Sequence, residues 1–320
     1  MTIEEIRQNI ENVIDPSRGK TLKELNAIKH IGINDEKDVV ILIIELGKLK
    51  TDSEDKVKRD LAKIIKLDLG FTGIKIQFEE NKATANISNK ETNFILVSSG
   101  KGGVGKSSVT INLAYALTRL GKKVGIIDAD IYCASIARML YVEETTVVVD
   151  ATNKIVPAVK DNIEFISTDF FSEKEAPLTW RGAMLASMIN NFLYQVAWSK
   201  DLNYILIDCP NGTGDIMLDL GNFLPNAKVL LVSEEDIASA YQVIKMGKAH
   251  RLMKQDILGV IINKYTGNEF ADIFLSNKLE TEVLAKIPYV PHYDNQYIFK
   301  ESTEAYECYN DLAILLNTQD

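Results

Sequence analysis

Hydrophobic positions in the first 80 residues change their period several times, which predicts a small unit of mixed helices and strands. Isoleucine recurs at positions 3, 6, 10 and 14, a spacing close to the 3.6-residue period of one helix face. Apolar runs then indicate strands, and acidic residues in a first turn mark a second helix. The predicted elements are a helix over 3–14, strands over 25–33 and 38–46, a helix that starts after 52–53 and stops at Gly70, and a strand over 73–79.

From residue 94 onward, short runs rich in β-branched residues alternate with helical patterns. Such runs fit strands covered on both faces, and the alternation is typical of a parallel sheet. The fold class that follows is α/β, a doubly wound and mostly parallel sheet preceded by a small N-terminal α+β domain. Strands are expected over 94–99, 122–130, 203–210, 227–234 and 257–264, and helices up to about 120 and over about 133–140, 184–198, 237–253 and 302–317.

The charge balance changes at the same place as the pattern, which supports a division into a domain over 1–82, a linker over 83–93 and a main domain over 94–320. Residues 1–90 hold 16 basic and 16 acidic side chains, so the remaining 20 basic and 29 acidic residues carry the whole net charge of −9. An acidic main domain gives no general support for binding to DNA or anionic membranes, because phosphate contacts need cations.

Run lengths and cysteine usage bear on location. No apolar run approaches the roughly 20 residues that span a bilayer, and the acidic, periodic N-terminus does not have the pattern of a signal peptide. The three cysteines, at 133, 209 and 308, form no short-spaced pair, which argues against a disulfide framework. We therefore expect a cytoplasmic protein that does not associate with a membrane.

Residues 100–107, GKGGVGKS, match the pattern G-x-x-x-x-G-K-[ST] between a predicted strand and a predicted helix. The glycines let successive backbone N–H groups point at phosphate oxygens, and the helix start adds partial positive charge. Lys106 is expected to reach the β- and γ-phosphates, and Ser107 to ligate Mg²⁺. The alternative, an ordinary glycine turn, does not account for this match in this context. The nucleotide-binding residues expected here are Gly100, Gly102, Gly103, Val104, Gly105, Lys106, Ser107 and Ser108.

Three carboxylates lie at the ends of predicted strands, at the edge where parallel α/β sheets bind ligands. Hydrolysis needs Mg²⁺ and a group that orients the attacking water. Asp130 is the candidate for orienting water, Asp128 for supporting the metal, and Asp208 for holding it as the Walker-B carboxylate. One such aspartate is often a helix cap, but three beside a phosphate loop favour a magnesium site formed by Ser107, Asp128 and Asp208.

Two further positions complete the predicted nucleotide site. Gly212, in the loop NGTGD over 211–215, allows close backbone approach to a γ-phosphate, as a switch loop requires. Asn263 ends the fifth predicted strand and is placed to read the base. The following residues lack the aspartate of the guanine pattern N-K-x-D, so adenine, and hence ATP, is the expected nucleotide.

Lys101, a second lysine in the loop, gives the form K-G-G-x-G-K-[ST]. This form resembles the deviant phosphate loop of the ParA/MinD/nitrogenase-iron-protein class of ATPases. The resemblance implies a homodimer that sandwiches two nucleotides, with Lys101 reaching the partner's phosphates. A solvent-exposed lysine is the alternative. Lys101, Lys106 and Asp130 are thus the expected catalytic residues of an ATPase that forms ADP and phosphate.

Five sequence strings together resemble the Mrp/ApbC branch of this class, which is linked to iron–sulfur cluster carriage. The front domain resembles a small module often fused to such ATPases, with Asp15-Pro16 near its start. The resemblance implies an ATP-dependent homodimer that binds a [4Fe–4S] cluster and passes it to client apoproteins or iron–sulfur assembly proteins. The strings are GKGGVGKSSV (100–109), KVGIIDADIY (123–132), WRGAM (180–184), YILIDCPNGTGD (204–215) and IPYVP (287–291).

The cysteine pattern departs from this family. Cluster-carrying members have C-x-x-C just after the base-reading asparagine, but residues 263–274 read NKYTGNEFADIF. Four cysteine ligands are the usual requirement for a cluster. Cys133 and Cys209 lie in the predicted switch regions, where a symmetric dimer could bring them together; buried packing is the alternative for both and for Cys308. The pattern favours a nucleotide switch whose cluster ligands are lost or relocated.

A nucleotide-gated regulator that binds DNA or a protein partner through the N-terminal domain is the alternative function. Cations recur along the second predicted helix, and Lys48 and Lys50 precede them; a solvated helix face is the simpler interpretation. A membrane-positioning ATPase is not favoured, because residues 312–320 contain no cation. Trp180-Arg181 is expected to position a switch or to start a helix, and the three histidines lack ligand spacing. The recurring cations are Lys56, Arg59, Lys63 and Lys66.

Overall fold

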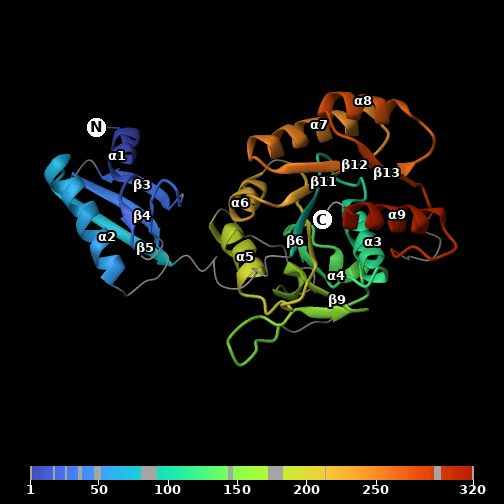
Figure 1. The fold of residues 1–320 in the computed structure, drawn as a ribbon, viewed down its shortest axis with the longest axis horizontal. Helices are drawn as coiled ribbons and strands as arrows, with labels where there is room; N and C mark the ends of the chain where they lie inside the picture. Colours follow the sequence, from blue (N-terminus) through green and yellow to red (C-terminus); the bar gives the residue numbers. More distant parts are fainter. Residues whose placement is uncertain are drawn as a thin grey trace. The chain divides into compact units, whose positions relative to one another are not determined.

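The chain forms two compact units, Met1–Ala85 and Asn86–Asp320, which Figure 1 draws as a ribbon. The computed structural model describes residues 2–16, 19–25, 27–34, 38–46, 52–80, 92–142, 147–171, 183–212, 214–291 and 297–318. No helix in these ranges is long and apolar enough to cross a membrane. The linker expected over 83–93 lies for the most part outside them.

The small unit is a three-stranded sheet covered on one face by helices. In the order β3-β4-β5, the first pair is antiparallel and the second parallel. Alternate residues of the central strand are fully buried, and they pack with apolar residues of α1 and α2. The elements are α1 (Ile3–Ile10), β1 (Ile14–Asp15), β2 (Lys20–Thr21), β3 (Ile28–Asn34), β4 (Val39–Leu46), α2 (Asp52–Lys63), a π-helical turn (Ile64–Asp68) and β5 (Gly73–Glu80).

Helix α1 is shorter than its isoleucine pattern predicts. It starts with a capping box, in which Thr2 Oγ1 accepts a hydrogen bond from the Glu5 amide and Glu5 accepts one from the Thr2 amide. It ends at Ile10, and Ile14 is 53% exposed on β1 instead of continuing the buried face. The prediction of a helix to residue 14 is therefore wrong. The residue before a proline is pushed towards extended backbone, and Asp15 precedes Pro16.

The large unit is built around an eight-stranded sheet. Its strand order is β13-β12-β11-β6-β10-β7-β9-β8, and among the described strand pairs of this sheet only the edge pair β8-β9 is antiparallel. The predicted doubly wound, mostly parallel α/β fold is confirmed. The elements are β6 (Asn93–Ser99), α3 (Lys106–Arg119), β7 (Val124–Asp128), α4 (Ile136–Met139), β8 (Ala158–Lys160), β9 (Ile163–Ile166), a 3-10 turn (Thr168–Phe171), α5 (Ala183–Tyr194), β10 (Tyr204–Asp208), α6 (Asp215–Phe223), β11 (Lys228–Ser233), α7 (Ile237–Leu252), β12 (Asp256–Tyr265), α8 (Phe270–Leu279), β13 (Val283–Pro288) and α9 (Glu304–Thr318).

Helices cover both faces of this sheet, which explains its nearly continuous apolar strands. On β11, Leu230 and Val232 join the core formed with α3 and α9. Leu231, between them, points to the opposite face and lies beside Gly247 of α7. Figure 1 shows α3 and α9 together on one side, and α7 beside α8. Burial on both faces leaves the strand ends as the place for polar chemistry.

The strand order reverses around β6. From β6 the chain continues to β7, which lies beyond β10, whereas β11 pairs with the other side of β6. Crevices at such reversals, outside the carboxyl ends of parallel strands, are the usual ligand sites of open α/β sheets. The loop over residues 100–105 and the ends of β7 and β10 meet at this place.

Candidate functional site

Glycines shape the loop between β6 and α3. Gly103 and Gly105 have φ of 84° and 86°, in the left-handed region that favours glycine. A Cβ at Gly105 would lie 2.2 Å from Asn263 Nδ2, and one at Gly100 would lie 2.3 Å from the carbonyl carbon of Gln242 on α7. Helix α3 then begins without a side-chain cap. Its first N–H groups therefore remain available to an anion, as a phosphate site requires.

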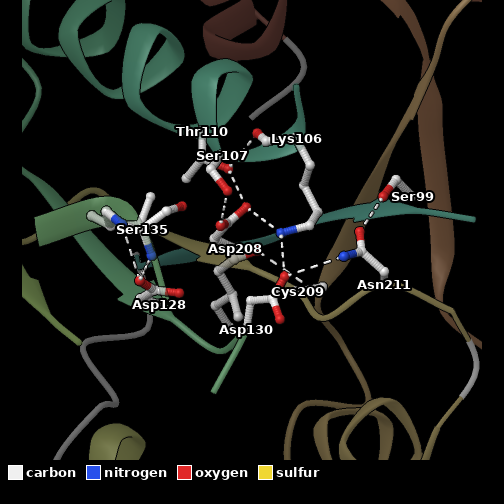
Figure 2. A network of polar contacts seen from close by, with 12 residues as sticks. Ser99, Lys106, Ser107, Thr110, Asp128, Asp130, Ser135, Asp208, Cys209 and Asn211 are labelled. Carbon is white, nitrogen blue, oxygen red and sulfur yellow. Dashed lines mark hydrogen bonds and ion pairs between the residues drawn. The ribbon is translucent and has the colours of Figure 1, made fainter. Parts of the chain in front are cut away.

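Three side chains of α3 converge on Asp208 at the end of β10 (Figure 2). Lys106 Nζ lies 2.9 Å from Asp208 Oδ1, and Thr110 Oγ1 donates to the same oxygen at 3.1 Å. Ser107 Oγ donates to Asp208 Oδ2 at 2.5 Å. Asp208 is fully buried, so its charge requires these partners. The phosphate loop and the expected Walker-B carboxylate thus form one network.

Lys106 is buried among carboxylates. Burial by itself disfavours its charge, but the negative charges of Asp208 and Asp130 outweigh that effect and raise the pKa of Lys106. Its Nζ is 3.6 Å from Asp130 Oδ2. The ammonium group therefore stays protonated and supplies a fixed positive charge at the loop.

Asp130 lies in the segment after β7, on the other side of Lys106 from α3 (Figure 2). Burial raises its pKa against the opposing effect of the Lys106 charge. Asn211 Nδ2 donates to Asp130 Oδ2 at 3.4 Å, and Ser99 Oγ donates to Asn211 Oδ1 at 3.2 Å. Asp130 is thus connected both to the phosphate loop and to the loop after β10.

Asp128 is placed differently from Asp130. It pairs in register with Asp208 on the neighbouring strand, and its Oδ2 accepts hydrogen bonds from the amides of Ser135 and Ile136 and from Ser167 Oγ. Its Oδ1 is buried without a hydrogen-bond partner among the described residues. Burial, and then the nearby charge of Asp208, raise the pKa of Asp128 to about 7. One oxygen therefore anchors the start of α4, and the other is left uncompensated.

Lys101 is held within its own chain. Its Nζ lies 3.4 Å from Glu234 Oε2 and 3.5 Å from Asp236 Oδ2, just after β11. Its side chain is 43% exposed. The hydrogen bond from Lys101 to Glu234 and the charge of Asp236 raise its pKa. A lysine in this position is charged and accessible to solvent.

The remaining predicted nucleotide residues lie at the rim of the same loop. Gly212 has φ of 82°, and its amide donates to the Ser99 carbonyl at 3.3 Å. Asn263 Nδ2 donates to the Val104 carbonyl at 2.8 Å, which brings the expected base-reading residue against the phosphate loop. Thr213, Trp180 and Arg181 lie outside the described residues, as does His292.

Among the polar residues of this network that were not predicted from the sequence are Thr110, Asn211, Ser99 and Glu234. Thr110 follows Lys106 by one helical turn, so helical periodicity could have placed it on the same face. Glu234 follows β11 as Asp208 ends β10, which is the signal already used for the aspartates. Ser99 and Asn211 meet only through long-range folding.

The thiols do not come together in the described part of the chain. Cys133 is exposed, Cys209 is fully buried behind Asp208, and Cys308 is partly buried with its Sγ 3.6 Å from the Lys286 carbonyl oxygen. Burial raises the pKa of Cys209, which disfavours the thiolate that metals bind. No group of three or more His, Cys, Asp or Glu side chains in the described ranges is arranged to hold a metal ion.

Comparisons with known proteins point to nucleotide-binding proteins and iron transfer. The sequence matches the family ParA, described as NUBPL iron-transfer P-loop NTPase, over residues 90–296. An iron-sulfur cluster carrier protein of Bacillus subtilis is 31% identical over 342 aligned positions, which cover 97% of this chain and 96% of that protein.

Two solved structures share the fold of the large unit. A nucleotide-binding protein of Archaeoglobus fulgidus in complex with ADP superposes with a TM-score of 0.52 at 28% identity, covering 70% of this chain and 88% of its own. The cell division ATPase MinD of Pyrococcus furiosus superposes with a TM-score of 0.56 at 24% identity, covering 71% and 99%. The second likeness concerns the fold alone.

Proposed function

The chain belongs to the ParA family of P-loop NTPases, matched through its NUBPL iron-transfer model, and from this premise we propose that it is an ATP-driven switch. It binds ATP with Mg²⁺, hydrolyses it slowly to ADP and phosphate, and works as a homodimer. Its role is in the assembly or transfer of iron–sulfur clusters to client apoproteins. The name of the Bacillus subtilis relative, iron-sulfur cluster carrier protein, supports this role.

The observation that carries the proposal is the convergence of Lys106, Ser107 and Thr110 on Asp208. A buried lysine, a hydroxyl and a carboxylate at a helix start are the groups that bind a nucleoside triphosphate and its metal. In the nucleotide complex, Lys106 exchanges part of its contact with Asp208 for phosphate oxygens. Asn263 reads the adenine.

The residues of the site fit Mg²⁺. This ion takes hydroxyl and carboxylate oxygens together with water and substrate phosphates, and Ser107 and Asp208 present such oxygens side by side. Asp128 adds a buried oxygen that no described residue satisfies. Ser107, Asp208 and Asp128 would hold the ion, which when bound neutralises charge that develops on the phosphates.

Asp130 orients the attacking water. Its carboxylate is nearly buried, and Lys106 and Asn211 fix it from two sides. The raised pKa of Asp130 makes it a better proton acceptor than an exposed aspartate. Through Asn211 and Ser99, it is connected to the loop around Gly212, so loss of the γ-phosphate is transmitted to the loop after β10.

Dimerisation rests on Lys101. We expect Lys101→Ala to bind MgATP with unchanged affinity but to lose most ATP hydrolysis, because the charge it brings to a second subunit is missing. Steady-state turnover and size-exclusion chromatography with and without MgATP measure both effects. Lys248→Ala, on the exposed face of α7, is the matched control. Unchanged turnover of Lys101→Ala contradicts the homodimeric site.

The cysteines do not fit direct ligation of a [4Fe–4S] cluster by the described chain. One thiol is exposed, one is buried, and one is on α9, and no C-x-x-C is present. We therefore propose that the chain supplies the nucleotide-driven step of transfer and does not carry a cluster on its own cysteines. Anaerobic reconstitution with iron and sulfide tests this: a stoichiometric cluster absorbance that is lost in Cys133→Ser contradicts it.

A second function is favoured by the surface of α2 and of the π-helical turn that follows it. Lys56, Lys58, Arg59, Lys63 and Lys66 are all exposed, and within the described residues none of them forms an ion pair. Such a row of cations suits a nucleotide-gated regulator that binds DNA or an acidic protein partner. DNA retention at low salt, with and without ATP, tests it. Reversing three of these charges must abolish retention, and reversing Lys245 and Lys248 on α7 must not; absence of retention contradicts DNA binding.

A further inference from the structure

Lys264 makes two close contacts at the rim of the nucleotide site. Its Nζ lies 2.6 Å from the Gly103 carbonyl oxygen and 2.6 Å from Glu234 Oε1. The preceding residue, Asn263, donates to the next carbonyl of the loop, that of Val104. Two consecutive residues of β12 therefore hold two consecutive carbonyl groups of the phosphate loop.

The backbone of β12 explains how neighbouring residues reach the same loop. Successive side chains of a regular strand point to opposite faces of the sheet. Here the pairing with β13 shifts register between Ile262 and Tyr265, and Lys264 has φ of 55°, in the left-handed region. Bulges of this kind re-aim side chains beside active sites. The irregularity turns Lys264 towards the loop that Asn263 already contacts.

Holding these carbonyls fixes the direction of two N–H groups. In a trans peptide unit the C=O and the N–H point in opposite directions, and the described chain contains no cis peptide. The Gly103 carbonyl belongs to the same unit as the Val104 N–H, and the Val104 carbonyl to the same unit as the Gly105 N–H. Lys264 and Asn263 hold these carbonyls on the side of the loop away from the expected phosphates. The N–H groups of the same peptide units therefore point towards the phosphates, as phosphate binding needs.

Glu234 connects this arrangement to Lys101. Its Oε1 pairs with Lys264 and its Oε2 with Lys101, so one carboxylate contacts two lysines. Lys264 also offsets a negative charge that would otherwise lie beside an anion site. When Lys101 moves to a second subunit, Lys264 keeps Glu234 compensated and the loop in place.

We propose that Lys264 is a positioning residue of the phosphate cradle, which acts through the Gly103 carbonyl and is balanced by Glu234. It orients amides for the phosphates and does not read the base. The proposal rests on the nucleotide binding proposed above and goes beyond it in assigning this side chain a role.

Calorimetric titration of the full chain with MgADP and with MgGDP tests this role. Lys264→Met keeps the apolar stem and removes the donor, so we expect the Kd for MgADP to rise about tenfold, the size of a lost hydrogen bond from a charged donor. The Kd for MgGDP should rise by the same factor, since the phosphates are common to both. Lys264→Arg should restore the Kd to within about threefold of the wild-type value.

The outcomes separate this proposal from the proposed function. If wild-type protein binds neither nucleotide, the proposed function itself fails. If wild-type protein binds and Lys264→Met binds equally well, the positioning role is overturned. A changed preference between MgADP and MgGDP, or failure of Lys264→Arg to restore binding, also overturns it. Lys245→Ala on α7 is the control, and unfolding without nucleotide should occur at the same temperature in all variants.

Discussion

A group of charged side chains in each unit of this chain shows two opposite environments, one buried and one exposed to solvent. At the nucleotide site of the large unit, Lys106, Asp130 and Asp208 are buried and share one network. On α2 of the small unit, the cations are exposed and have no ion-pair partner among the described residues. Buried charges must be compensated, so each depends on the others, whereas exposed charges are screened by water and salt. Substitutions should therefore be large and coupled at the first site and small at the second.

Removal of the central buried cation should have the largest effect. We expect Lys106→Ala to weaken binding of MgADP by at least about 100-fold, because the variant loses the phosphate contact and leaves Asp208 and Asp130 facing each other. Isothermal titration calorimetry measures the loss, with Lys248→Ala as the control. Binding within tenfold of wild type would contradict the buried-charge interpretation.

Asp128 should give the next largest effect, through pH. Its pKa is raised from 3.8 to about 7, so the folded state holds a proton that the unfolded state releases. Its stabilising contribution is present below about pH 4 and is lost as the pH rises to about 7. We expect Asp128→Asn to be about 1–2 kcal/mol more stable than wild type at pH 8, and the difference to shrink towards pH 5. Denaturant unfolding at both pH values measures it; a constant difference contradicts the raised pKa.

One hydrogen bond to the buried carboxylate should matter less. Thr110→Val removes the donor to Asp208 Oδ1 and should cost about 1.5 kcal/mol of unfolding free energy, because the acceptor is charged. Thr118→Val is the matched control on the same helix, since Thr118 donates only to the Ala114 carbonyl. If both variants lose the same unfolding free energy, the hydrogen bond from Thr110 to Asp208 contributes no more than the ordinary bond from Thr118 to a backbone carbonyl.

The exposed cations of α2 should give the smallest effect on stability. Lys63→Gln is expected to change the unfolding free energy by less than about 0.5 kcal/mol. Urea unfolding of wild type and variant at low and high salt measures it. A loss above about 1 kcal/mol would mean that the face is a structural contact and would remove the contrast between the units.

Local sequence patterns predicted the phosphate loop and its aspartates well, but they did not predict most of the contacts that support them. The loop over residues 100–107 is contiguous, and the aspartates end apolar strands, so both were visible, and the family resemblance is confirmed. Glu234 and Lys264 meet the loop only after β11 is placed beside β6 and β12 beside β11. Ser99 and Asn211 are 112 positions apart. Such contacts depend on topology, which short patterns do not contain.

The same limit applies to element lengths. The isoleucine pattern extended the first helix to residue 14, because periodicity alone does not weigh the effect of Pro16 on Asp15. Helices α6 and α8 and strands β8, β9 and β13 were not predicted. The short β8 and β9 lie at one edge of the sheet and β13 at the other, and β8 and β13 are only partly buried, so their apolar signal is weaker.

The glycines of the phosphate loop differ in how readily another residue could replace them during evolution. At Gly100 any side chain would meet the backbone of α7, and at Gly105 both conformation and Asn263 oppose one. Gly103 has open space around it but a backbone angle that other residues seldom adopt. At Gly102 an added methyl group would make only ordinary contact, 3.6 Å from Asn211. Related chains should therefore vary first at position 102 and keep glycine longest at 100 and 105.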